Sequence, residues 1–347
     1  MLIGSGQICK PSGELVCNFT VGIEQLQDLP DNDTLSGNSF VVGQMEWRIV
    51  LSNSIVNGIS SAIRFGVVCN GQNEGAVIWS SLSLVRLKIV AVEGREDYEF
   101  AQIVKLFHCE AENHENALFF NVLWELLFDA RSPFQIDGSF TFVAHIKSDF
   151  PFYIHMEDEP LTELIAKQGP RVETFFVKKQ IFSKMSNFCN NLFFGGFEEE
   201  HTQNFTTQIM PPSTLEDFRK MVAVLNGEDF SVLDDNSLEG LLGVADYYQF
   251  DCIKGYCIDY IYRTKPLKNA ILKYRLAVSN HFDVLKLSLL RRISTSTFHF
   301  YNFENNLREC EMLKSANPVA FEQLMVRYRE LCENSMEISE DEEDDEY

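Results

Sequence analysis

The stretch FVKKQIFSKMSNFCNNLFF, residues 176–194, indicates that part of this chain is built from helices. Apolar side chains recur along it every three or four residues, which places them on one face of a helix. The positions on that face are Ile181, Met185, Phe188 and Leu192. We therefore expect a helix here that buries one side against a folded domain.

The same period continues toward the C-terminal end of the chain. It recurs at Leu215, Phe218, Val222 and Leu225, at Leu238, Leu241, Leu242 and Ala245, and at Phe321, Leu324, Met325 and Tyr328. Two signals mark helix starts: the capping pattern Asn236-x-x-Glu239, and Asn317-Pro318 as an N-cap residue before a first-turn proline. From about residue 160 onward the sequence therefore predicts mainly helices.

The first half of the chain has a period of two instead. Polar and apolar residues alternate along segments 62–67, 82–89 and 139–146, as expected of strands with one buried face. The turn-forming pairs Asn57-Gly58, Asn70-Gly71 and Asp137-Gly138 lie between the apolar segments. Short strands at this spacing predict an antiparallel β-sandwich.

Composition limits the functions that the chain can have. Its 347 residues allow two or three domains, and its formal net charge of −22 repels nucleic acid and anionic membranes. Nine cysteines, an odd number placed in apolar segments, suit buried thiols in a reducing compartment. The sequence shows no secretory signal and no run of ~18 apolar residues. We expect an intracellular protein, cytoplasmic and/or nuclear.

The sequence contains no recognisable catalytic motif. We find no Gly-rich phosphate loop, no Gly-x-Ser-x-Gly elbow and no His-Glu-x-x-His pair. His108, Cys109 and His114 lack a second cluster at zinc-ligand spacing. We therefore expect no cofactor, no metal ion and no enzymatic activity.

A series of motifs in the helical half follows a fixed order. They are residues 176–182, residues 186–193, Phe197-Glu198-Glu199, residues 218–227 and Ala245-Asp246-Tyr247-Tyr248-Gln249-Phe250. In this order and spacing they resemble a BTB/POZ domain, which has an α+β fold, over roughly residues 162–261. Lys178 departs from the pattern, since the family usually has a histidine there.

The first half resembles a MATH (meprin and TRAF homology) domain, which is a β-sandwich. The matching segments are residues 40–49, 66–70, 79–80 and 124–129, the last running on to 136–138. Together the two halves resemble MATH–BTB proteins, the substrate adaptors of cullin-3 ubiquitin ligases. The resemblance implies a multi-domain chain. It would have a MATH-like sandwich at 1–150, a BTB domain at 158–263, a C-terminal helical extension at 264–334 and an acidic disordered tail at 335–347.

The resemblance also implies two protein-binding sites. Phe197 would insert into cullin-3 and Glu199 would make a polar contact beside it. Leu118, Phe119 and Phe120 are the candidates for the substrate groove, although the family's Trp-Gly-Phe signature is replaced by Asn116-Ala117-Leu118. Because neighbours on a strand point to opposite faces, we expect at least one of the two phenylalanines to belong to the core.

The expected partners are cullin-3 and a protein substrate that the sequence does not identify. One alternative is a protein-interaction scaffold with a BTB fold that does not bind a cullin; a BTB transcriptional regulator and a hydrolase rank lower. BTB domains commonly dimerise through an N-terminal helix. Here Pro151 and Pro160 leave room for at most a turn or two of helix, so we expect at most a weak homodimer with a reduced interface.

Overall fold

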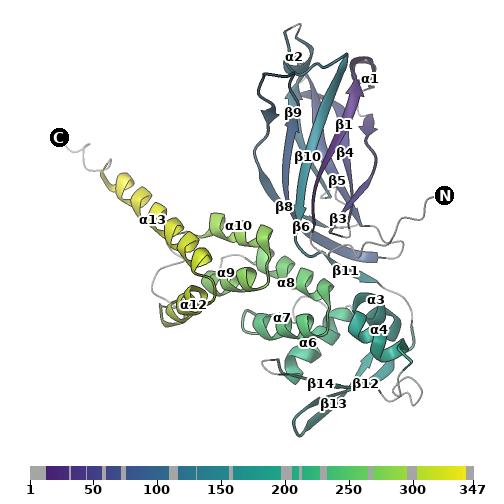
Figure 1. Cartoon of the computed structure of the whole chain (residues 1–347), viewed down its shortest axis with the longest axis vertical. Coiled ribbons are helices and arrows are strands. Elements are labelled where there is room, and N and C mark those ends of the chain that lie inside the picture. Colours follow the sequence, from purple (N-terminus) through teal and green to yellow (C-terminus); the bar gives the residue numbers. More distant parts are fainter. Residues whose placement is uncertain are drawn as a thin grey trace.

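The structure is a computed structural model. It describes residues 13–30, 33–43, 45–56, 60–71, 76–108, 116–129, 131–155, 159–196, 205–210, 213–226, 233–264, 269–294 and 303–340. Figure 1 shows a β-sandwich at the top, and below it a small sheet with helices that continue sideways into a C-terminal helical extension. This arrangement confirms the predicted fold class.

The N-terminal half is a sandwich of two antiparallel sheets. In one sheet the order is β1 (Gly13–Gly22), β10 (Ser139–Ser148), β6 (Ala76–Ile89) and β11 (Phe152–His155), with β7 (Tyr98–Glu99) and β8 (Ile103–His108) also paired to β6. In the other it is β2 (Thr34–Ser36), β4 (Met45–Val56), β5 (Ser60–Gly71) and β9 (Ala117–Leu123), with β3 (Phe40–Val42) paired to β4. Two short helices, α1 (Ile23–Gln27) and α2 (Trp124–Phe128), complete it. Between the sheets lie large buried side chains, including Trp47, Phe65 and Phe142.

One of the predicted turns is seen directly. Asp137 and Gly138 both have positive φ, 49° and 73°, as a type I′ turn requires. Ile136 and Ser139 on either side exchange two backbone hydrogen bonds of 2.9 Å. The turn thus leads the chain into β10 with the expected register; Asn57-Gly58 lies outside the described residues.

The second half begins with a three-stranded sheet. β12 (Thr162–Gln168) pairs antiparallel with β13 (Arg171–Val177) and parallel with β14 (Phe205–Gln208). The helices that pack with it are α3 (Lys179–Met185), α4 (Asn187–Phe194), α6 (Leu215–Leu225), α7 (Leu238–Tyr247) and α8 (Asp251–Arg263). The extension that follows consists of α9 (Ala270–Ser279), α10 (Asp283–Arg292), α12 (Phe303–Ala316) and α13 (Pro318–Glu340).

The helix predicted through residues 181–192 is in fact two helices. Ser186 is extended, with φ −145° and ψ 121°, and separates α3 from α4. Its hydroxyl accepts a 3.0 Å hydrogen bond from the N–H of Cys189 and donates one of 2.5 Å to the carbonyl of Tyr248. The break is stable because Ser186 acts as the N-cap of α4.

The helix boundaries agree with the sequence signals only in part. Asn317 is an N-cap as predicted, since its side-chain oxygen accepts from the N–H of Ala320 at 3.0 Å. Asn236 is not an N-cap. The N-cap of α7 is Ser237, one residue later, and the carboxylate of Asp234 accepts a 2.8 Å hydrogen bond from the N–H of Ser237. We expected a disordered tail from residue 335, whereas α13 continues to Glu340; residues 341–347 lie outside the described part.

The sandwich has its own interior core, and a second hydrophobic core, that of the helical half, extends onto the outer face of the sandwich. Along β6, alternate residues such as Val85 and Leu87 face the interior of the sandwich. Leu82 and Leu84 point the other way and join the core of the helical half, together with Phe152 of β11. The part of the outer face around Leu82, Leu84 and Phe152 is therefore covered by helices rather than by solvent.

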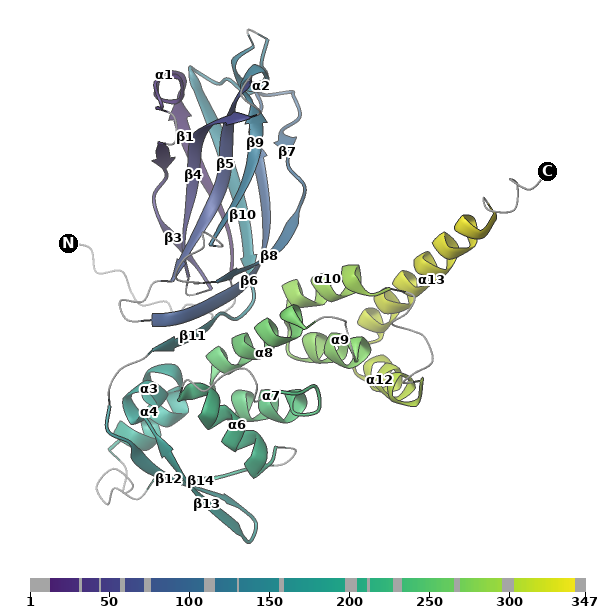
Figure 2. The same cartoon turned by 180° about the vertical axis from the view of Figure 1, so that it is seen from behind.

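Helix α8 makes the closest contact across this boundary. In Figures 1 and 2 it runs directly beside β11. The ring of Phe152 lies 5.0 Å from that of Tyr256, centroid to centroid. A Cβ added to Gly255 would lie 2.3 Å from the carbonyl carbon and oxygen of Pro151, so only glycine permits this approach.

The connection between the halves is a strand and not a helix. The sheet of the sandwich continues past residue 150, because β11 pairs with the first part of β6. The remaining segment, residues 156–161, is too short for a helix of two turns. The chain thus has no room for a dimerisation helix at this point.

We predict that Gly255→Ala destabilises the protein by about 1–3 kcal/mol, because the added methyl group forces α8 away from Pro151. Chemical denaturation of the full chain measures this change. Gly22→Ala is the matched control, since its Cβ would meet its nearest neighbour at an ordinary 3.6 Å. Equal losses for the two variants would contradict the close approach of α8.

Candidate interaction surfaces

The described residues form no metal-binding cluster, and Cys69 and Cys189 among them are buried. No group of three or more His, Cys, Asp or Glu among them is arranged to hold a metal ion. His108 is buried on β8, while Cys109 and His114 lie outside the described residues. Burial raises the pKa of the Cys69 thiol well above its usual value and that of Cys189 to about 12. Such thiols stay protonated and are poor nucleophiles.

The three groove candidates of the sandwich lie on β9. Within the described part of the chain this strand pairs only with β5, so it is the last strand of its sheet. Leu118 and Phe120 are half-buried against the sandwich core. Phe119 points to the opposite face, where the guanidinium carbon of Arg64 lies 4.5 Å from the centroid of its ring.

A glycine of β5 sets the position of Phe119. Gly66 is paired with Phe119 across the two strands. A Cβ at Gly66 would lie 2.0 Å from the carbonyl oxygen of Leu118 and 2.6 Å from the Phe119 ring. Only glycine at this position therefore leaves room for the Phe119 ring beside β5.

Of the two phenylalanines, Phe120 is the one that packs against the sandwich core, as expected for at least one of them. Its ring lies 4.9 Å from that of Phe100, which in turn lies 5.0 Å from Tyr98. Lys105 of β8 donates a 2.7 Å hydrogen bond to the carbonyl of Ala117, so β8 and β9 are held together at this edge. Tyr98 and Phe100 were not expected at this edge from the sequence, although their spacing of two residues was a signal for one face of a strand.

In the described part of the chain β9 is an edge strand, which is the geometry that the addition of an extended peptide requires. An edge strand presents backbone N–H and C=O groups that an added strand can pair with, and neighbouring side chains then select the sequence. Tyr98 is 41% exposed and Phe119 is half-buried with its ring on the outer face, so aromatic surface is available beside the edge. The arrangement is suited to protein recognition and contains no paired acid and base for catalysis.

The second candidate site, Phe197 with Glu199, lies outside the described residues. The chain enters that segment from α4 through Gly195 and Gly196, the latter with φ 73°. The last residue of α4, Phe194, is 44% exposed, and the ammonium of Lys179 lies 5.0 Å from its ring centroid. The described part of the surface next to this segment is therefore aromatic and has a cation beside it.

A second aromatic group surrounds the end of α7. The ring of Tyr248 lies 5.0 Å from Phe188 and 4.9 Å from Tyr247, which is 50% exposed. The hydroxyl of Tyr248 is buried, bonds to Thr207 at 2.9 Å and donates to the carbonyl of Gln208 at 2.9 Å. Burial raises its pKa to about 12, so this tyrosine stays neutral and ties α7 to β14.

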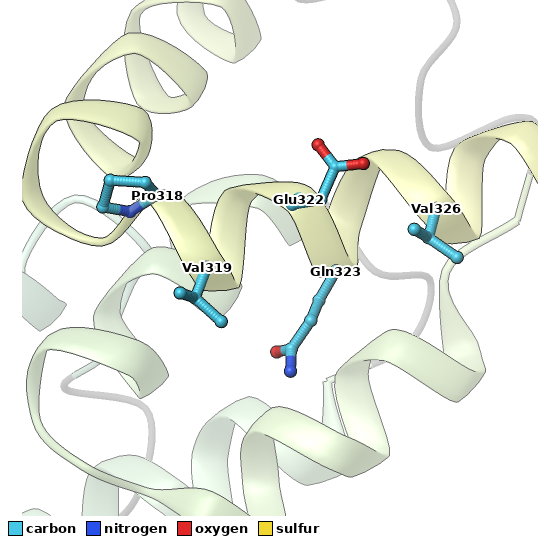
Figure 3. Close-up of a pocket in the computed structure, with 5 residues that line it drawn as sticks. All are labelled: Pro318, Val319, Glu322, Gln323 and Val326. Atoms are coloured by element: carbon cyan, nitrogen blue, oxygen red, sulfur yellow. The ribbon is translucent and has the colours of Figure 1, made fainter.

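A hollow of about 520 Å³ lies beside α13. It is lined by Pro318, Val319, Glu322, Gln323 and Val326, and Figure 3 shows Val319, Gln323 and Val326 on the same side of the helix. Its lining contains one carboxylate and no partner base or nucleophile. It therefore supports no catalytic step.

Residues 165–265, from β12 to just beyond α8, match the family model described as BTB/POZ domain. The chain contains a BTB/POZ domain. It is also 23% identical over 292 residues to "BTB and MATH domain-containing protein 15" of Caenorhabditis elegans, an alignment that covers 82% of this chain and 98% of that protein. The resemblance to MATH–BTB proteins seen in the sequence is confirmed.

None of the described helices is long and apolar enough to cross a membrane.

We predict that Phe120→Ala lowers the free energy of unfolding by about 2 kcal/mol, because this ring packs against Phe100. Phe119→Ala should cost less than about 1 kcal/mol, since it removes one contact with Arg64. Urea denaturation of the full chain compares the two. A larger loss for Phe119→Ala would mean that this ring has a structural role and is not available to a partner.

Proposed function

We propose that this protein is a substrate-recognition adaptor that links a target protein, held by the sandwich, to a cullin-3 ubiquitin ligase, held by the BTB domain. One observation carries the proposal. A sandwich with an open aromatic edge and a BTB domain occur in one chain, and the name of a relative that aligns over 82% of this chain contains the same two domains, BTB and MATH. The chain itself would perform no chemistry, and it would accelerate ubiquitin transfer by bringing two proteins together.

The two binding surfaces are suited to different roles. The β9 edge, with Leu118, Phe119 and Phe120, is the substrate side. On the ligase side, Phe197 and Glu199 follow directly after α4, and the extension after α8 would complete the surface for the cullin. The formal net charge of −22 disfavours nucleic-acid partners, and the proposed place of action is the cytoplasm or nucleus.

A second candidate function is a protein-interaction scaffold that binds no cullin. Its support is the connection between the halves, where β11 occupies the place at which dimerising BTB proteins have a helix. Lys178, at a position where the family usually has histidine, points in the same direction. In this case the sandwich still binds a protein, but no ubiquitin is transferred.

We predict that the full chain binds the cullin-3 N-terminal domain and that Phe197→Ala weakens binding about ten- to hundredfold. The reason is the loss of roughly 1.5–3 kcal/mol from burying this side chain at the interface. Glu199→Ala should weaken binding as well. Isothermal titration with the purified proteins measures both effects.

The controls are Phe176→Ala and Glu163→Ala, which remove the same side chains from exposed positions on β13 and β12. They should bind like the wild type. Failure of the wild-type chain to bind would reject the adaptor and favour the scaffold.

Because the halves share a core, a peptide-array search for the substrate should use the full chain, and Phe119→Ala should reduce the signals.

A further inference from the structure

A buried carboxylate lies where the sandwich meets the helical half. Asp149, between β10 and β11, is 2% exposed. One of its side-chain oxygens accepts a 2.8 Å hydrogen bond from the N–H of Leu285, and the other accepts one of 3.2 Å from Val284. Both donors belong to the first turn of α10. A residue of the sandwich connection therefore caps a helix of the C-terminal extension.

Helix α10 has no cap of its own. The residue before it, Phe282, has no side chain that can accept a hydrogen bond, and its φ of −84° and ψ of 78° are non-helical. The N–H groups of a helix's first turn have no partner inside the helix, and burying them unpaired is costly. The N-terminus also favours a negative charge. The two side-chain oxygens of Asp149 supply the acceptors that this turn needs.

Other contacts hold the same helix end in place. Lys147 of β10 forms a 2.8 Å ion pair with Asp283, the first residue of α10. The ring of Phe150 lies 5.8 Å from that of Phe282, and the ammonium of Lys254 lies 5.1 Å from the Phe150 ring. The connection between the two strands thus contacts α10 on several sides.

The other end of α10 is tied to the BTB domain. Arg292 donates to the carbonyl of Tyr262 at 2.8 Å and to that of Thr264 at 3.4 Å, at the end of α8. Its guanidinium carbon also lies 5.3 Å from the ring centroid of Tyr262. Helix α10 therefore contacts the sandwich connection at its first turn and the last turn of α8 at its other end.

We propose that Asp149 couples the sandwich to the BTB side: the connection between β10 and β11 orders the start of α10 and thereby sets how tightly the helical half holds its protein partner. Asp149 is a positioning residue in this role and does not touch the partner. The identity of that partner as cullin-3 rests on the proposed function. The coupling itself rests only on the contacts around α10.

The coupling should respond to pH. Burial raises the pKa of Asp149 to about 7; the bonds from Leu285 and Val284 and the charge of Lys147 lower it, while Asp283 raises it. Lys254 of α8 and Glu14 of β1, which lies 4.0 Å from Lys147, also face this region. A raised pKa means that the folded protein binds this proton more tightly than the unfolded chain does. The stabilising contribution of Asp149 therefore falls as pH rises from about 4 to about 7.

The test is hydrogen exchange of the full chain combined with titration of the cullin-3 N-terminal domain. Asp149→Ala should speed exchange of the Val284 and Leu285 amides by about tenfold, the size expected for a lost N-cap, and leave α13 unchanged. It should also weaken cullin-3 binding by a similar factor. Asp97→Ala is the matched control, since that carboxylate also accepts from a backbone N–H, at Ala91, but far from α10.

Asp149→Asn separates positioning from a purely structural role, and it carries the test if Asp149→Ala does not fold. The amide keeps one acceptor but no longer titrates. Exchange at α10 should stay close to that of the wild type, while the fall in stability between pH 4 and 7 becomes shallower. Unchanged exchange of the Val284 and Leu285 amides in Asp149→Ala would overturn the coupling, whereas an unchanged pH profile in Asp149→Asn would overturn only its pH dependence.

The two proposals can fail separately. If the wild type binds no cullin-3, the proposed function is rejected, and the exchange measurements still decide the coupling between Asp149 and α10. If the wild type binds and α10 loosens in Asp149→Ala while affinity stays the same, the effect on the partner is rejected.

Discussion

The arrangement of this protein depends on one strand that is apolar on both faces. β6 fills the sandwich with one set of alternate side chains and presents Leu82 and Leu84 on the other side, where α8 and α10 cover them. Removing leucine side chains from water is the largest favourable term available at such a boundary. Further along the same outward face the residues are Arg86 and Lys88. The helices therefore cover the outward face of β6 at Leu82 and Leu84, and this cover ends where the outward residues become charged.

This cover changes what the connection between the two halves does. A linker of polar and flexible residues would let the domains move independently. Here Asp149 accepts hydrogen bonds from α10, Phe150 packs beside Phe282, and Pro151 lies against Gly255. Each consecutive residue of the connection has a role in the contact. The β9 edge and the BTB domain are therefore held in a defined relation, which favours a proximity function over independent binding by two modules.

Local patterns in the sequence predicted the features that depend on local interactions. The helix faces, the alternating strands and the Asp137-Gly138 turn all follow from side-chain period and backbone preference. The break at Ser186 was missed because its partner, the carbonyl of Tyr248, is distant in sequence. The role of Asp149 was missed for the same reason. On the candidate sites, alternation predicted a core phenylalanine beside the groove, whereas Phe197 falls outside the described residues and stays a prediction.

The shared core also affects how the chain folds as it is synthesised. Leu82 and Leu84 leave the ribosome long before α8 and α10, which cover them. Until those helices arrive, the nascent sandwich carries an exposed apolar strip, the kind of surface that attracts chaperones or neighbouring chains. Contacts between residues so far apart in sequence also form slowly, because a long loop must close first. The N-terminal domain therefore reaches its final state only when most of the protein has been made.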